Sequence, residues 1–484
     1  MKSGSLLRNT LLYVPAQLFA PLLQFAATVI WTHLFDPAAF GLITFVVAAQ
    51  ELTGGLGLNW WSMYLMRFRK RYPGADSERF RAMDGRIVAC GAAGQAFLAA
   101  PVLMMVGVAP TPGLVAATIA YLSTRTLLTH YSEWARSDHR IGVYTLAQLT
   151  GPVAGSGLSI IAALSLGPDP AIALAAMAVG QAAGLVVVLI GLRLRLRFGR
   201  FDMAIFAEAG QYGLPLIFSG LFVWAATNGV RVLVEAREGI VGVGLFSVGW
   251  GLGQRMANML ATLCNAAAYP LAVDRLESGD PSGALRHVGL NGALMIGLLA
   301  PASAGIAVLS APLARLVIAP QFQEMTILIL PLAMAAGAAR ALRLHTGDQT
   351  GLLLRRTGAM TIFNLLDAVI TLTCAAIGVH FGGIAGAAVG CLIGTGVGSA
   401  LAFAFVVTKL GLRIPLPTLI GILLATALMT CVLRLAPAPA DFLLLGLQIV
   451  LGVAVYAFGI VTLFPEARRL MGAQLARFRI AWSS

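Results

Sequence analysis

Charged residues are scarce in this 484-residue chain, where Asp, Glu, Lys and Arg make up 11% and a typical soluble domain has roughly 25%. Lysine is nearly absent, since Lys2, Lys70 and Lys409 are the only ones, and arginine carries almost all of the positive charge. Hydrophobic residues account for 58%, with a mean hydropathy of +0.86. This composition excludes a soluble globular protein, which could not cover its surface with polar groups, and a disordered chain, which has too few apolar residues.

Motifs for metal and nucleotide binding are also missing. All five cysteines lie inside apolar runs, without the spacing of a zinc site or a disulfide scaffold; they are Cys90, Cys264, Cys374, Cys391 and Cys431. No GxxxxGK[ST] phosphate loop occurs, which excludes ATP hydrolysis by that route. The short connections hold no paired carboxylates or nucleophile constellation, so we expect neither an enzyme nor a cofactor.

Long apolar runs dominate the sequence instead. A membrane-spanning helix needs roughly 20 mostly apolar residues, and we predict fourteen such spans in an all-α polytopic membrane protein. They are residues 9–33, 38–66, 87–106, 114–135, 142–165, 171–192, 211–234, 242–271, 288–309, 323–345, 357–379, 384–408, 416–435 and 441–464.

Basic residues alternate between the connections. Most of them lie at the N-terminus, in every second connection and in the C-terminal tail, whereas the opposite connections hold only Arg237, Arg315 and Arg434. Because cytoplasmic loops of membrane proteins collect Lys and Arg, both termini are predicted to be cytoplasmic. The net charge of +13 is therefore an orientation signal, and no nucleic-acid partner is expected.

Three pairs of segments match in order along the chain. Tyr13-Val14-Pro15 corresponds to Tyr212-Gly213-Leu214-Pro215, Phe40-Gly41-Leu42 to Val243-Gly244-Leu245, and Arg140-Ile141-Gly142 to Arg356-Thr357-Gly358. These ordered matches predict one six-helix unit present twice in the same orientation. The two units would be related by an axis along the membrane normal, an arrangement known among transporters. The predicted parts are an N-lobe at 1–200, a C-lobe at 201–410, two extra helices at 411–465 and a cytoplasmic amphipathic tail at 466–484.

Further segments carry a resemblance to a known family. They are the opening Leu6-Leu7-Arg8-Asn9-Thr10, the stretch Leu34-Phe35-Asp36-Pro37-Ala38-Ala39-Phe40-Gly41 and the arginine-rich connection 67–86, together with the repeat and the two added helices. The chain resembles, over essentially its whole length, the polysaccharide-flippase branch of the MOP superfamily, the Wzx-type translocases of O-antigen and exopolysaccharide units.

The resemblance implies a flippase of the bacterial cytoplasmic (inner) membrane. Its substrate would be an oligosaccharide on a polyprenyl pyrophosphate, moved to the external leaflet by alternating access, and its partners would include the polysaccharide polymerase and chain-length machinery. Two related functions stay open. A MurJ-type lipid II flippase has the same number of spans, whereas a MATE-type antiporter uses an acidic residue in its first helix, where this chain has Gln17, Gln24 and Thr28 but no carboxylate.

Polar residues in helical register within the spans predict a hydrated interior. Arginine forks match the geometry of phosphate groups, and amides can bind sugar hydroxyls. The predicted pyrophosphate- and glycan-binding residues are Arg125, Arg255, Arg231, Asn258 and Asn228, and Glu51 and Asp367 are predicted to couple an ion or to form ion pairs.

Two other groups of polar residues have simpler interpretations. Arg340 and Arg343 lie close to the cytoplasmic end of their span, where snorkelling to the interface accounts for them. His130 and Glu133 are interpreted as a satisfied interfacial pair.

Overall fold

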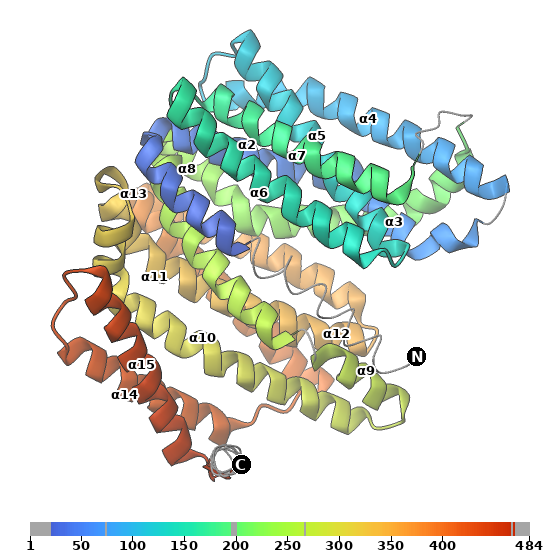
Figure 1. Ribbon diagram of the computed structural model, residues 1–484. Coiled ribbons are helices and arrows are strands. Elements are labelled where there is room, and N and C mark those ends of the chain that lie inside the picture. The colour runs from blue at the N-terminus through green and yellow to red at the C-terminus, as the bar shows by residue number, and fades with distance from the viewer. Residues whose placement is uncertain (1–20, 73–74, 195–200, 266–267, 466–467, 470–484) are drawn as a thin grey trace, which may run out of the picture. The chain divides into compact units, whose positions relative to one another are not determined.

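The computed structural model describes residues 21–72, 75–194, 201–265, 268–465 and 468–469, and within these ranges every regular element is a helix (Figure 1). Residues 21–34 are helical. They are followed by α2 (Pro37–Gly54), the π-helical turn η1 (Gly55–Asn59), α3 (Trp60–Phe68), the 3₁₀ turn η2 (Arg69–Arg71), α4 (Ala75–Met105), α5 (Pro112–Ser137), α6 (Ile141–Leu166) and α7 (Pro170–Leu192). The predicted tail at 466–484 and the first part of the span at 9–33 lie outside the described residues.

The second half of the chain contains two long helices that are broken at glycines. Its elements are α8 (Met203–Asn265), α9 (Ala268–Glu277), α10 (Pro281–Val317), α11 (Pro320–Leu342), the π-helical turn η3 (Arg343–Asp348), α12 (Gln349–Leu353), α13 (Thr357–Leu410), α14 (Leu416–Leu435) and α15 (Phe442–Leu463). α8 breaks at Gly239, where φ is 67°, and α13 breaks at Gly383, where φ is 56°. Only glycine adopts such angles readily, so each of these helices supplies two predicted spans.

The helix starts follow from the local sequence. Asp36, Asp169 and Asp280 each cap a helix whose first residue is proline, and each carboxylate accepts a backbone N–H from the first turn. Proline suits this position because its missing N–H would have had no helical partner. At α10, bonds from the Gly283 N–H and the Ser282 hydroxyl hold the pKa of Asp280 below its ordinary value.

Ten helices in the described residues are long and apolar enough to cross a membrane, with α8 and α13 each counted once. α5 is absent from this set, since its middle carries Arg125, Thr126, Thr129 and His130. Each of the fourteen predicted spans nevertheless overlaps a helix of the structure. The all-α polytopic fold class is confirmed.

The described chain divides into two compact units. Unit 1 is drawn from Met1–Val248 and Asn364–Gly394, and unit 2 from Gly249–Phe363 and Thr395–Ser484. The lobe boundaries at residues 200 and 410 stay predictions.

Unit 1 has an aromatic core at one end and glycine-mediated helix packing elsewhere. The Trp61 ring stacks on Phe80 and Tyr64, with centroid separations of 5.2 and 5.5 Å. α6 and α7 lie side by side (Figure 1), and a Cβ added at Gly180 would overlap the backbone of Gly155. Small residues allow such close approach in membranes, where packing replaces the hydrophobic effect between helices.

Two glycines that are equivalent in the predicted repeat contact each other. Gly41 of α2 packs against Ile240 and Gly244 of α8, and Gly244 packs against the carbonyl of Pro37. All of these residues belong to unit 1. Equivalent residues that touch are expected near an axis relating two repeats, so this contact supports the match between the two segments.

Unit 2 buries two arginines that were expected at the membrane interface. Arg340 is 5% and Arg343 1% exposed, and Arg340 Nη2 donates to Thr395 Oγ1 at 3.0 Å. The snorkelling interpretation is wrong for both. The predicted span ends at residue 345, but the helix continues through η3 and α12 to Leu353, which keeps both side chains inside the packed bundle.

The contact at Gly244 predicts a specific sensitivity to added volume. A methyl group there overlaps the Pro37 carbonyl, and overpacking typically costs about 1–3 kcal/mol. Gly244→Ala should therefore lower the thermal midpoint of the detergent-solubilised protein. In the matched control Gly157→Ala, the methyl group meets open space, so helix propensity should leave stability equal or higher. Equal midpoints for the two variants would contradict the packing argument.

Candidate functional site

A polar cavity of about 270 Å³ lies in unit 1 between α5 and the continuous helix formed by α2, η1 and α3. Its lining includes Glu51 and Asn59 from the continuous helix and Arg125 and Thr129 from α5. Arg125 lies at the middle of α5, so the cavity brings ionisable groups together well inside the helices rather than at their ends.

Arg125 is the least satisfied group of this cavity. It is half-buried, and its Nη1 atom is buried without a hydrogen-bond partner in the described part of the chain. A buried donor left unpaired costs about 1–3 kcal/mol, and more when the group is charged. Glu51 lines the same cavity with an exposed carboxylate. The cavity therefore offers one cation with free donor capacity and one anion.

A second, smaller cavity of about 120 Å³ continues the first toward α8. The two share Glu51, Gly55 and Asn59, and Leu216 and Trp224 of α8 line the second. Gly55 and Asn59 are the first and last residues of η1. Single π-helical turns occur frequently at functional sites, and here the turn forms the wall common to both cavities.

Three of the predicted site residues form one hydrogen-bonded chain. Asn228 Nδ2 donates to Glu51 Oε2 at 2.9 Å, Arg231 Nη1 donates to Asn228 Oδ1, and Arg231 Nε donates to Ser247 Oγ at 3.2 Å. Trp224 Nε1, one helical turn before Asn228, donates to the Ala48 carbonyl at 2.9 Å. These contacts hold α2 against the first half of α8 and join the two halves of α8 across the Gly239 break.

The other predicted site residues are not brought into this cavity. Asp367 belongs to unit 1 but is only 1% exposed, and it accepts a bond from Thr371 Oγ1 at 3.2 Å. Arg255 and Asn258 lie on the part of α8 that belongs to unit 2, where Arg255 is half-buried and Asn258 is exposed. The grouping of Arg255 with Arg125 stays a prediction.

A layer of uncharged polar residues adjoins the cavity. Gln50 Nε2 and Gln95 Nε2 both donate to Thr126 Oγ1, at 3.0 and 2.7 Å, and Gln95 also reaches Thr53 Oγ1 at 3.2 Å. All four side chains are buried. The bonds join α2, α4 and α5 directly beside Arg125.

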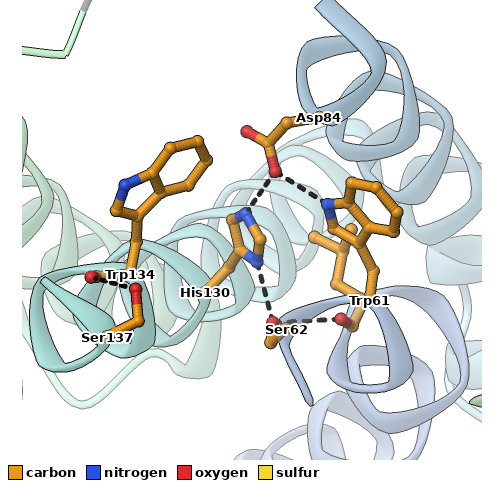
Figure 2. A network of polar contacts seen from close by, with 7 residues as sticks. Trp61, Ser62, Asp84, His130, Trp134 and Ser137 are labelled. Atoms are coloured by element: carbon orange, nitrogen blue, oxygen red, sulfur yellow. Dashed lines mark hydrogen bonds and ion pairs between the residues drawn. The ribbon is translucent and has the colours of Figure 1, made fainter. Parts of the chain in front are cut away.

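Figure 2 shows a second buried network, toward the end of α5 that carries Trp134 and Ser137. His130 Nε2 lies 2.9 Å from Asp84 Oδ1, which also accepts the Trp61 Nε1 proton at 2.7 Å, and His130 Nδ1 lies 2.7 Å from Ser62 Oγ. These four residues are at most 3% exposed. Ser62 and His130 also line the 270 Å³ cavity.

This network corrects the sequence-based pairing of His130. Its partner is Asp84 rather than Glu133, which pairs instead with Arg136 at 2.8 Å. The prediction omits Asp84 because the predicted span begins at residue 87, whereas α4 begins at Ala75. The spacing of the buried residues Phe80, Met83 and Ile87 is the helical signal that could have extended α4 backwards.

Comparison with known proteins agrees with this architecture. Residues 115–327 match a family model described as polysaccharide biosynthesis protein, whereas no curated protein matches the sequence. A structure of the lipid II flippase MurJ in an inward closed conformation superposes with a TM-score of 0.77 at 12% identity, covering 95% of this chain and 100% of that chain.

Two MATE transporter structures match less closely. An inward-facing multidrug resistance MATE family transporter of the MOP superfamily gives a TM-score of 0.57 at 18% identity, covering 82% of this chain and 97% of its own. The Vibrio cholerae MATE transporter VcmN in its bent form gives 0.51 at 16% identity, covering 83% and 96%. This chain has the MOP-superfamily fold. It is a multi-pass integral membrane protein.

The buried network of unit 1 predicts energetic coupling between Asp84 and His130. Removing either side chain leaves the other without its partner, so the single variants Asp84→Ala and His130→Ala should each lower stability. Their double-mutant cycle should show a coupling free energy of about 0.5–3 kcal/mol, measured by reversible unfolding in detergent. The control cycle combines Asp84→Ala with Ser165→Ala, at the exposed end of α6, and should be additive. An additive Asp84–His130 cycle would refute the coupling.

Proposed function

We propose that this protein is a flippase that moves a polyprenyl-pyrophosphate-linked oligosaccharide from the cytoplasmic to the external leaflet, without a catalytic step. The observation that carries the proposal is the polar cavity at the middle of α5, where Arg125 presents a buried Nη1 atom without a partner. The match of residues 115–327 to polysaccharide biosynthesis proteins supports a glycan substrate, and the MurJ-like fold supports translocation of a lipid-linked one.

The physical problem of such transport is desolvation. An isolated ionised group that enters hydrocarbon costs on the order of tens of kcal/mol by Born reasoning. A hydrated cavity removes most of that cost when it offers donors to the charge. Arg125 supplies a planar fork suited to phosphate oxygens, and Asn59 and Asn228 supply amides suited to sugar hydroxyls. The lipid tail would stay in the bilayer.

The membrane potential supplies a direction without ATP. Moving one charge through 100 mV is worth about 2.3 kcal/mol, so an anion leaving a negative interior gains free energy with each charge. Two pyrophosphate charges would gain roughly twice that amount. We further propose residence in the bacterial inner membrane with cytoplasmic termini, next to the polysaccharide polymerase and chain-length machinery that use the product.

A lipid II flippase is the second candidate. The chain superposes on a MurJ structure over 95% of its length. Lipid II carries the same pyrophosphate group with a different glycan, so the cavity chemistry suits both substrates. Reconstituted protein offered each labelled substrate separately would distinguish them.

Two arginines, Arg125 in the cavity and Arg255 on the unit 2 part of α8, are expected to be required for transport. We expect Arg125→Ala to lower the rate of leaflet-to-leaflet transfer of a labelled lipid-linked oligosaccharide in liposomes about tenfold or more, since a lost charge-assisted bond is worth about 1.5–3 kcal/mol. Arg255→Ala should lower the rate similarly, and Arg125→Lys should recover it only partly because lysine lacks the fork.

The matched control is Arg237→Ala, which removes an exposed arginine that does not line the cavity and should transport normally. Every variant is first checked for insertion and thermal stability. Wild-type transfer rates in both Arg125→Ala and Arg255→Ala would overturn the cavity assignment.

A further inference from the structure

The arginine-rich end of unit 1 contains a separate polar pocket of about 230 Å³, which we call the arginine pocket. It lies between η2, the first turns of α4 and the last turn of α5. Its polar lining consists of Arg69, Lys70, Tyr72, Ser77, Arg81, Ser137 and Asp138. It shares no residue with the membrane-depth cavity that holds Arg125.

Positive charge in the arginine pocket exceeds the negative charge that the lining provides. Arg69, Lys70 and Arg81 are set against one carboxylate, Asp138, which forms an ion pair with Arg69. Lys70 Nζ lies 3.0 Å from the ring nitrogen Nε2 of His139, which brings no negative charge. The lining therefore carries an uncompensated excess of cations.

Neighbouring groups bring further cations, and the neighbouring carboxylates of Asp84 and Glu208 are already bonded to other residues. Arg81 and Arg140 both lie within electrostatic range of the Arg69 guanidinium and repel it. Asp84 attracts Arg69, but its carboxylate is already bonded to His130 and Trp61. Glu208, at the same end of unit 1, accepts bonds from Tyr64 and Tyr72.

Arg81 provides the observation that points to a ligand. Its Nε atom is buried and has no hydrogen-bond partner among the described residues, although the side chain lines the pocket. Leaving a guanidinium donor buried and unpaired beside other cations is costly. An anion with several acceptor oxygens would satisfy that donor and offset the repulsion at once.

The pocket is also partly pre-organised. The Arg69 guanidinium lies over the Trp134 ring, 4.6 Å from its centroid, and is held from the other side by Asp138. Ser137, on the last turn of α5 beside Trp134, is fixed by a 2.8 Å bond to the Trp134 carbonyl (Figure 2). A guanidinium fixed in this way loses little side-chain entropy when it binds a ligand.

We propose that the arginine pocket binds the phosphate group of an anionic lipid. Two guanidinium groups and one ammonium group match phosphate oxygens in charge and in donor geometry, and the volume suits a headgroup phosphate rather than an oligosaccharide. Two sources share this chemistry: the pyrophosphate of a lipid-linked glycan and the phosphodiester of an anionic phospholipid. The pocket is a docking site outside the transport cavity, and it stands whether or not the transport proposal holds.

The test measures binding of inorganic pyrophosphate by isothermal titration calorimetry to the full-length protein in phosphatidylcholine nanodiscs. Arg81→Gln should weaken binding about tenfold, as expected for loss of one charge-assisted contact. Lys70→Gln changes an exposed side chain, so it keeps the test valid if Arg81→Gln fails to fold, and it should weaken binding several-fold. The control Arg86→Gln removes an exposed arginine of the same helix that lines a different cavity, and it should bind like wild type.

A second arm distinguishes the two sources by adding phosphatidylglycerol to the nanodiscs. If a phospholipid phosphate occupies the pocket, the apparent pyrophosphate affinity should fall more in wild type and Arg86→Gln than in Arg81→Gln. An equal fall in pyrophosphate affinity in wild type, Arg86→Gln and Arg81→Gln would reflect only the surface potential of the lipid. The ligand of the pocket would then be the pyrophosphate group rather than a phospholipid phosphate. The proposal is overturned if Arg81→Gln and Lys70→Gln both bind pyrophosphate like wild type. It is also overturned if all three variants lose affinity equally, because that result indicates only diffuse attraction to positive charge.

Discussion

Polar groups in the hydrocarbon region of a membrane must find partners inside the protein or face water. In unit 1 this requirement organises the polar residues of α2, α4 and α5 into sets that satisfy one another. Thr126 accepts from Gln50 and Gln95, and Asp84 binds both His130 and Trp61. Arg125 lies next to Thr126 on α5, and its Nη1 atom is buried without a partner among the described residues.

One continuous helical element connects the features of unit 1. This element comprises α2, η1, α3 and η2 and runs from Pro37 to Arg71. Its first part makes the glycine contact with α8, and Glu51 and Asn59 form part of the cavity wall. Further along, Trp61 and Ser62 belong to the buried network, and Arg69 lines the arginine pocket. The π-helical turn lies in the middle of this element. Because an extra residue in a helix shifts the facing of everything beyond it, η1 sets how Ser62 and Arg69 are presented relative to Glu51.

Hydrophobic runs and charge alternation were sufficient to predict the helices, since a membrane span is determined mainly by local composition. Helical spacing placed Asn228 and Arg231 on one face of their span, and the structure joins them in a hydrogen-bonded chain with Glu51. Partner identity was not predictable in the same way. The sequence predicts Asp84 in a connection and pairs His130 with Glu133, because charged residues near a helix end give the same sequence pattern whether they face water or a buried partner. The burial of Arg340 and Arg343 was missed for the same reason, because it depends on where α12 ends and on Thr395, far away in the sequence.

α5 explains why unit 1 has two distinct cationic sites. Arg125 lies at its middle and Ser137 at its end, twelve residues apart, which corresponds to roughly 18 Å along a helix that rises 1.5 Å per residue. A single phosphate or pyrophosphate group is too short to contact both. The arginine pocket is therefore a site separate from the membrane-depth cavity, and the two share no lining residue. The cations of the arginine pocket come from η2 and α4 rather than from α5, and His130 lies on α5 between Arg125 and Ser137.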